Sequence, residues 1–236
     1  RLPHGDPLRL TEADVNALWI TLRLALVTTF ILLLLGTPLA WWLSRGHSRI
    51  KHLVEAVVAM PLVLPPTVLG FYLLIALAPD GILGHSWAAM GGGRLAFSFS
   101  GLVIGSVLYS LPFVVQPIQN TFSQLQEQLL EAASTLRASP LNRFFTLVLP
   151  LSRPGLITAA TLGFAHTVGE FGVVLMIGGN IPGETQVLSI AIYDHVESLE
   201  YAQAHLLSAG LLLFSFVTLY LVYAINRRGW SRRLRP

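Results

Sequence analysis

Long apolar runs, separated by short polar intervals, dominate the chain. Five of these runs are predicted to be helices that cross a membrane, since each approaches or exceeds the roughly 20 residues that a bilayer requires. The fold class predicted is therefore an all-α integral membrane protein with about five transmembrane helices. Thr11-Glu12-Ala13-Asp14 has the capping-box pattern, so a helix is predicted to begin there, just before the first run. The predicted spans cover residues 18–43, 53–78, 95–118, 155–177 and 205–225.

One polar interval between two spans itself has the pattern of helix, and it covers residues 123–150. Apolar residues recur at helical spacing from Leu125 to Leu136, which predicts a short amphipathic helix. Ser139 followed by Pro140 is typical of a new helix N-cap with proline at the first helical position. Two short helices with a bend between them are predicted. From the residues alone they could be a simple connector or a docking surface for a partner.

The second predicted span contains Pro61, Pro65 and Pro66, which a regular helix does not accommodate. Each proline lacks an N–H group and clashes with the preceding helical turn. Broken backbone at membrane depth is tolerated only where protein or a water-filled cavity satisfies the freed polar groups. This segment is predicted either to line a pathway or to form a kink buried among neighbouring helices.

The fourth predicted span carries two ionisable residues, His166 and Glu170, four positions apart and so on one helix face. Ionisable groups inside a membrane are costly to desolvate and often functional. Glu170 could instead pair with His166, or with backbone N–H groups at a kink between Gly169 and Gly172. Because an ionised carboxylate would repel an anionic cargo, a helix-shaping or gating role, or a protonated state, is favoured over direct contact with an anion.

The composition agrees with a membrane protein. Hydrophobic residues make up 53% of the chain and charged residues 11%, and the mean hydropathy is +0.65. The absence of cysteine excludes disulfides and thiolate metal sites. A pI near 9.6 would fit nucleic-acid binding, but the basic residues lie beside the apolar runs, where membrane topology explains them better. No nucleic-acid partner and no metal site are predicted.

The distribution of basic residues predicts the orientation, because cytoplasmic loops are enriched in lysine and arginine. The predicted periplasmic regions hold Arg1, Arg9 and Arg94. The N-terminal segment 1–17 is therefore predicted to be periplasmic, and the basic tail 228–236 cytoplasmic. The interval 123–150 then faces the cytoplasm. The bases on the predicted cytoplasmic side are Arg45, Arg49, Lys51, Arg137, Arg143, Arg153, Arg227, Arg228, Arg232, Arg233 and Arg235.

The common motifs of hydrolases and nucleotide-binding enzymes are absent: there is no Walker A run, no GxGxxG after a strand, no HExxH and no GxSxG. An intramembrane protease built from Ser110, Ser208, His166 and Glu170 is not expected, since nothing in the sequence fixes a nucleophile to a base. We expect a transport subunit with no catalytic residues of its own.

Several segments together resemble a known family. Glu131-Ala132-Ala133, followed by Ala138 and Leu149-Pro150, resembles the EAA loop of permease subunits in bacterial binding-protein-dependent ABC importers. Within that family the prolines of the second span, with Gly70, the run from Gly169 to Gly172 and the run from Asn180 to Thr185 are similar to molybdate permeases. Sulfate permeases share the glycine-glutamate segment.

The resemblance implies a function and a set of partners. The chain would be the membrane-spanning subunit that passes molybdate, or its near-isostere tungstate, from a periplasmic molybdate-binding protein to the cytoplasm. It would lie in the cell inner membrane, surrounded by lipid, as a dimer with a second copy of itself above two cytoplasmic ATP-binding subunits. ATP and Mg would be bound by the partner ATPase and no cofactor by this chain. The alternatives are a sulfate or thiosulfate permease, or a membrane scaffold that transports nothing.

The resemblance also implies roles for individual residues. Those expected to couple to the ATPase are Glu131, Ala132, Ala133, Leu136, Arg137, Ala138, Ser139 and Pro140. Those expected at the translocation pathway or gate are Pro61, Val63, Pro65, Pro66, Thr67, Gly169, Glu170, Phe171 and Gly172. Those expected to face the binding protein are Asn180, Pro182, Gly183 and Glu184.

Arg137 departs from the family pattern, which usually has glycine after Leu136. If this position requires a positive φ, arginine would cost on the order of 1 kcal/mol or more. Ser139-Pro140 could supply the break between the helices instead, so the geometry of the turn is open at this point.

Overall fold

The computed structural model of the chain describes residues 10–46 and 48–233, and for Glu127 and residues 225–233 it describes the backbone alone. All regular elements in this part of the chain are helices, as predicted. The predicted N-terminal segment 1–17 and the predicted tail 228–236 lie partly outside the described residues, at 1–9 and 234–236.

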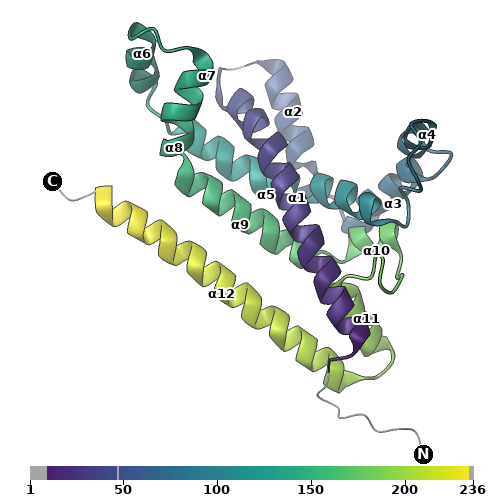
Figure 1. Cartoon of the computed structure of the whole chain (residues 1–236). Coiled ribbons are helices and arrows are strands. Elements are labelled where there is room, and N and C mark those ends of the chain that lie inside the picture. Colours follow the sequence, from purple (N-terminus) through teal and green to yellow (C-terminus); the bar gives the residue numbers. More distant parts are fainter. Residues whose placement is uncertain (1–9, 47, 234–236) are drawn as a thin grey trace, which may run out of the picture.

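Three helices pack against one another at the centre of the molecule: α1 (Glu12–Ser44), α5 (Phe99–Ser123) and α9 (Arg153–Val168) (Figure 1). α12 (Tyr201–Arg233) runs along the outside. The predicted capping box at the start of α1 is confirmed, because Thr11 Oγ1 accepts from the Asp14 N–H at 3.1 Å and Asp14 accepts from the Thr11 N–H at 2.9 Å.

The number of helices that are long and apolar enough to cross a membrane agrees with the prediction of about five. Within the described residues there are four such helices, or up to five if one bent helix pair counts as a single span. In that pair, the helical stretch Pro140–Leu151 and α9 meet at an angle of 72°. The four are Glu12–Ser44, Pro66–Ala89, Phe99–Ser123 and Tyr201–Ala224.

The predicted interruption of the second span, 53–78, by its prolines is present. The chain forms α2 (Arg49–Ala59), a short 3-10 turn (Met60–Leu62) and α3 (Pro66–Leu77). The prolines are the physical reason, because two of them occupy first-turn positions, where no backbone N–H is needed. Beyond α3 the chain continues into α4 (Ile82–Ala89), which stands to one side of the central helices (Figure 1).

The fourth predicted span, 155–177, is also interrupted. α9 ends at Val168, and a separate short helix, α10 (Gly172–Gly178), follows. Gly169 caps α9, and Phe171, with φ −131° and ψ −65°, leaves the helical conformation before α10 begins. α11 (Leu188–Glu197) then precedes α12. Each of the two spans that carry unusual residues is therefore divided into half-helices.

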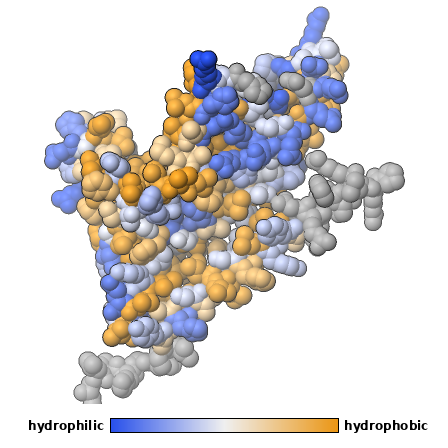
Figure 2. All heavy atoms as spheres, turned by 180° about the vertical axis from the view of Figure 1, so that it is seen from behind, coloured by the Kyte–Doolittle hydropathy of each residue, from blue (hydrophilic) through white to orange (hydrophobic). Residues whose placement is uncertain are grey.

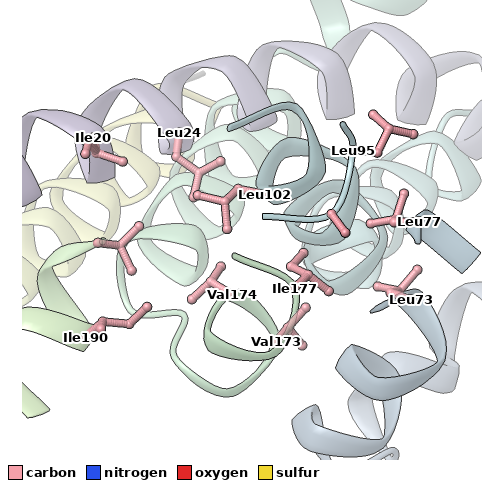
Figure 3. Packing of buried hydrophobic residues seen from close by; sticks show 12 residues of the cluster. Ile20, Leu24, Leu73, Leu77, Leu95, Leu102, Val173, Val174, Ile177 and Ile190 are labelled. Carbon is pink, nitrogen blue, oxygen red and sulfur yellow. The ribbon is translucent and has the colours of Figure 1, made fainter. Parts of the chain in front are cut away.

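Two clusters of buried apolar side chains hold these elements together. The first joins α1, α3, α5, α10 and α11, and Figure 3 shows Leu24 of α1 beside Leu102 of α5, with Leu73 of α3 and Ile177 of α10 in the same cluster. The second joins the other half of α1 to α5 and α9. The half-helices are thus fixed by burial against α1 and α5, since burying apolar side chains is the main favourable term in packing.

The predicted pair of small helices in the interval 123–150 is confirmed as α6 (Glu127–Thr135) and α7 (Pro140–Arg143). Ser139 caps α7, as predicted, with its Oγ accepting from the Asn142 N–H at 3.2 Å. A π-helical turn (Phe144–Val148) and α8 (Leu149–Leu151) continue toward α9. Figure 1 places α6 and α7 near one end of α1 and α11 near the other, and Figure 2 shows polar residues gathered at the upper right, over the α6 end.

Candidate functional site

The first residues of α3 and the break between α9 and α10 line a common cavity of about 590 Å³. The start of α3 contributes one wall, and the end of α9 with the start of α10 contributes another. Tyr109 of α5 closes part of the remainder. The lining residues are Pro66, Thr67, Tyr109, Ala165, His166, Gly169, Glu170, Phe171, Gly172, Leu175 and Met176. Two segments more than a hundred positions apart in the sequence thus form one candidate pathway site.

Two glycines allow the half-helices to approach closely. A Cβ atom on Gly172 would lie 2.8 Å from the Pro66 Cβ, and one on Gly70 would lie 2.7 Å from the Met176 Cβ. Both separations are shorter than carbon atoms tolerate, so α3 and α10 can pack this way only with glycine at these two positions.

Glu170 is buried, with 3% of its surface exposed, and both carboxylate oxygens have partners on α5. Ser106 Oγ donates to Oε2 at 2.5 Å, and Ser110 Oγ donates to Oε1 at 2.7 Å. The Ser189 hydroxyl of α11 donates to the backbone carbonyl of Glu170. The carboxylate therefore links the break after α9 to α5, and the backbone carbonyl of the same residue links it to α11.

His166 lies beside this carboxylate, with its Nδ1 3.6 Å from Glu170 Oε1 and 2.8 Å from Ser110 Oγ. Its ring stacks on Phe113, with the ring centroids 3.8 Å apart, and lies near the Tyr109 ring at 4.9 Å. The predicted pairing of Glu170 with His166 is therefore present, but two serine hydroxyls contact the carboxylate more closely than the histidine does.

Ser110, His166 and Glu170 do come together, yet not in the order of a catalytic triad. In a triad the acid orients the histidine, and the other ring nitrogen contacts the nucleophile. Here the serine hydroxyl bonds directly to the carboxylate, and the same serine oxygen contacts the histidine Nδ1. A serine that gives its proton to a carboxylate is not activated for attack.

The serine partners of Glu170 were missed by reasoning from the sequence. The available signal was their spacing, since Ser106 and Ser110 lie four residues apart in an otherwise apolar span. The cavity brings together Pro66 and Thr67 with the whole predicted segment Gly169 to Gly172. The predicted pathway residues Pro61, Val63 and Pro65 are not among those that line it, and Val63 is 86% exposed on the molecular surface.

The predicted binding-protein-facing segment forms a loop after α10. Asn180, Pro182, Gly183 and Glu184 are exposed, while Thr185 is buried. The loop is held to the end of α10, because Thr185 Oγ1 donates to the Gly178 carbonyl at 2.6 Å. Asn180 Nδ2 donates to Asp194 Oδ2 of α11 at 2.6 Å, and Gln186 Nε2 donates to the same oxygen at 2.8 Å.

A cluster of three ionisable side chains joins α1, α11 and the residue directly before α12. His195 of α11 contacts Asp14 through Nε2 and Glu200 through Nδ1, each at 2.8 Å. Burial alone would lower the pKa of His195, but the hydrogen bonds to the two carboxylates and their charges outweigh it, so the pKa lies above its ordinary value.

This cluster predicts a pH-dependent stability. A histidine whose pKa is raised on folding stabilises the protein below its unfolded pKa, near 6.5, and this contribution is lost as pH rises through the higher folded pKa. We expect the melting temperature of the detergent-purified protein to fall between about pH 6 and pH 9 and His195→Gln to remove most of this dependence. His85→Gln, at an exposed histidine of α4, is the control. An unchanged pH dependence in His195→Gln would contradict the prediction.

At the other end of the molecule, the α6–α7 region exposes apolar side chains. Leu136 is 83% exposed and Leu141 is 72% exposed, in the same region as the exposed Glu131. The predicted coupling residues lie on α6, α7 and the turn between them, with Ala133 and Ala138 half-buried. Exposed leucines on polar helices outside the apolar spans are typical of a surface that binds another protein.

Arg137 has a φ of +58°, so the turn does require the left-handed conformation for which the family usually has glycine. Its N–H donates to the Ser134 carbonyl at 2.9 Å, which keeps the turn closed. Arg143 of α7 spans the turn by donating to the Ser134 hydroxyl and to the Leu130 carbonyl, the latter at 3.4 Å. The neighbours of Arg137 therefore impose a conformation that its own side chain disfavours.

This strain predicts that Arg137→Gly tightens the turn. Relief of the left-handed strain, less the extra backbone freedom of glycine, should stabilise the turn by about 1 kcal/mol. Amide hydrogens of residues 135–139 should exchange about fivefold more slowly in mass-spectrometric hydrogen exchange. Ala138→Gly, at a position without positive φ, should speed exchange instead. Faster exchange in Arg137→Gly would show that the arginine side chain holds the turn.

Among the described residues, neither the cavity nor the α6–α7 region holds the side chains of a metal centre. Among the described residues, no group of three or more His, Asp or Glu side chains is placed to hold a metal ion. The chemistry that the cavity offers is a buried carboxylate, hydroxyl groups and an imidazole, which can bind or orient a polar ligand.

A family model for the "Binding-protein-dependent transport system inner membrane component" matches residues 33–230. This chain belongs to that family. The match takes in the divided spans, the α6–α7 region and α12 as parts of a permease core, and family members of this kind are transport components, not enzymes. The apolar helices are accordingly those of a multi-pass membrane protein.

Named relatives align with nearly the whole chain. The chain is 60% identical to the molybdenum transport system permease protein ModB of Azotobacter vinelandii, over 92% of this chain and 96% of the relative. It is 35% identical to ModB of Haemophilus influenzae, over 94% and 95%. A probable sulfate transport system permease protein, cysT, of Marchantia polymorpha is 33% identical, over 92% and 75%.

Solved structures share the permease fold. A chain of a bacterial alginate ABC transporter superposes with a TM-score of 0.76 at 16% identity, over 96% of this chain and 83% of that one. A chain of the MetNI methionine ABC transporter, in an inward-facing conformation, superposes with a TM-score of 0.68 at 18% identity, over 93% and 99%. At these identities the likeness supports the fold and nothing finer.

Proposed function

We propose that this chain is the membrane-spanning permease of an ATP-driven importer that carries molybdate, and by chemical similarity tungstate, into the cell. The observation that carries the proposal is the 60% identity to a molybdenum transport permease along nearly the full length of both proteins. Sulfate permeases match at about 33%, which favours molybdate over the sulfate or thiosulfate alternative.

The proposed pathway passes the cavity between α3 and the α9–α10 break. Irregular backbone at membrane depth is tolerated where it borders a cavity, and the α9–α10 break does so here, opposite the first residues of α3. A single copy has too few helices to surround a channel, so a second copy would supply the opposite wall. The dimer would lie in the inner membrane among lipid.

The proposed energy source is a pair of ATP-binding subunits that dock on the α6–α7 surface. The exposed Leu136 and Leu141 and the exposed Glu131 support this surface as the contact. ATP and Mg would be bound by those subunits and no cofactor by this chain. With α6 and α7 in the cytoplasm, the exposed loop Asn180 to Glu184, at the other end of the molecule, would face the periplasm and a molybdate-binding protein.

Reconstitution tests the proposal. The permease, its ATPase and the binding protein in liposomes should accumulate molybdate only with ATP, and tungstate should compete more effectively than sulfate. Preferential uptake of sulfate would favour the sulfate alternative. ATP hydrolysis with no accumulation of any oxyanion would instead favour a scaffold that does not transport.

A further inference from the structure

The turn after α6 has the geometry of a Schellman cap, a helix ending that usually takes glycine. The Ala138 N–H donates to the Ala133 carbonyl at 3.2 Å, and the Arg137 N–H donates to the Ser134 carbonyl at 2.9 Å. This pair of bonds requires a positive φ at the residue before Ala138, and Arg137 has a φ of +58°. Backbone hydrogen bonds alone therefore close the turn, and they would do so equally with glycine.

The Arg137 side chain takes no part in that cap. Among the described residues it has no hydrogen bond or ion pair, and it is exposed. Arg143 is the arginine that spans the turn, because it is half-buried and donates to the Leu130 carbonyl and to the Ser134 hydroxyl. Strained backbone conformations that persist are concentrated at functional sites. The strain at Arg137 therefore points to a use for its side chain outside the described chain.

The surface around Arg137 is apolar and cationic. Leu136 is 83% exposed and Leu141 is 72% exposed. The Glu131 side chain lines a cavity of about 370 Å³ together with Arg45 and Arg143, and Arg137 does not line that cavity. A guanidinium group keeps its charge at every physiological pH. The turn thus presents a permanent cation beside two exposed leucines.

We propose that Arg137 is a recognition residue for the ATP-binding subunit, and that it forms an ion pair with an Asp or Glu side chain beside the apolar surface that binds Leu136. The arginine fork matches a carboxylate through two parallel hydrogen bonds. The same arginine disfavours an ATPase that lacks this acid, because its charge would be desolvated without a partner.

This inference rests on the proposed function and names the chemistry of the partner at the α6–α7 surface. It assigns the choice of partner to a position at which the family usually has glycine. The contact is made by the side chain, whereas the backbone of the turn is already complete without it.

Binding of the purified ATP-binding subunit to the permease in detergent tests the inference, at salt concentrations from about 50 to 500 mM. In the wild type, affinity should fall as salt rises, because salt screens an exposed ion pair. Arg137→Gly should lower the affinity at low salt about tenfold and reduce its salt dependence, as for the loss of a charge-assisted hydrogen-bonded pair. Arg137→Glu should lower the affinity further, with salt relieving part of the loss.

Hydrogen exchange of residues 135–139 in the same variants separates recognition from a structural role. In Arg137→Gly the turn should exchange more slowly although the affinity falls, so the two measurements should move in opposite directions. If the arginine only held the turn in shape, exchange would become faster as the affinity fell. That result would overturn the inference.

Arg94→Glu is the matched control. Arg94 is also an exposed arginine, and it lies before α5, whose 25 residues, about 37 Å of helix, separate it from α6. This variant should bind the ATPase as the wild type does, and an equal loss here would reduce the effect at Arg137 to one of general charge and refute the contact. Wild-type affinity in both Arg137→Gly and Arg137→Glu would refute it as well. Failure of the proposed function is distinguishable, because the wild-type permease would then bind no ATPase at any salt concentration.

Discussion

Leu136→Asp is expected to detach the ATPase from the permease. Leu136 is 83% exposed at the end of α6, directly before the left-handed residue Arg137, so its side chain projects from a rigid turn. A large apolar side chain at the centre of a protein interface typically contributes about 2 kcal/mol or more. A charge there would also be desolvated without a partner. We expect affinity for the ATPase to fall at least about thirtyfold, measured by co-purification and by titration in detergent.

The matched control is Leu199→Asp. Leu199 lies between α11 and α12 and is 70% exposed. Its φ is positive, a conformation that aspartate tolerates better than leucine. It lies at the end of the molecule away from α6, so this variant should retain the ATPase. If Leu136→Asp still assembles and transports normally, the α6–α7 surface is not the docking site.

Glu170→Ala is expected to destabilise the permease and nearly abolish transport. The change would leave the hydroxyls of Ser106 and Ser110 buried without their acceptor, and would remove the link between α5 and the break after α9. Leaving a buried hydrogen-bond donor without its acceptor costs about 1–3 kcal/mol for each group. The melting temperature of the purified complex and ATP-dependent uptake are the two measurements.

Two variants sharpen this experiment. Glu170→Gln keeps the shape and one acceptor oxygen, so it should recover much of the stability. Glu184→Ala removes an exposed carboxylate from the loop after α10 and should leave the melting temperature unchanged. A wild-type melting temperature in Glu170→Ala would mean that the buried network contributes nothing to the fold.

The features that the sequence predicted well are those with local causes. The capping box at Thr11, the N-cap at Ser139 and the interruption at Pro65 and Pro66 each depend on residues within a few positions of one another. The number of apolar runs likewise follows from composition along short windows. These elements could be read from the chain without knowing how it packs.

The features that the sequence did not predict depend on contacts across the fold. The residues that satisfy Glu170 lie 64 and 60 positions away on another helix, and no local pattern assigns that pairing. A kink between Gly169 and Gly172 was one alternative from the sequence, but the close fit of Gly172 against Pro66 is a contact that periodicity cannot indicate. For Arg137, the sequence raised the question of a positive φ, but only the packing of α6 against α7 answers it.

The close contact of α3 with α10 has a mechanical consequence. Gly172 lies against Pro66 and Gly70 against Met176, so α3 and α10 are packed closely together. α3 and α10 are therefore expected to move together as one rigid unit, with hinges at the proline segment before α3 and at Gly169 before α10. If the cavity beside them is the proposed pathway, its opening is expected to involve both hinges together.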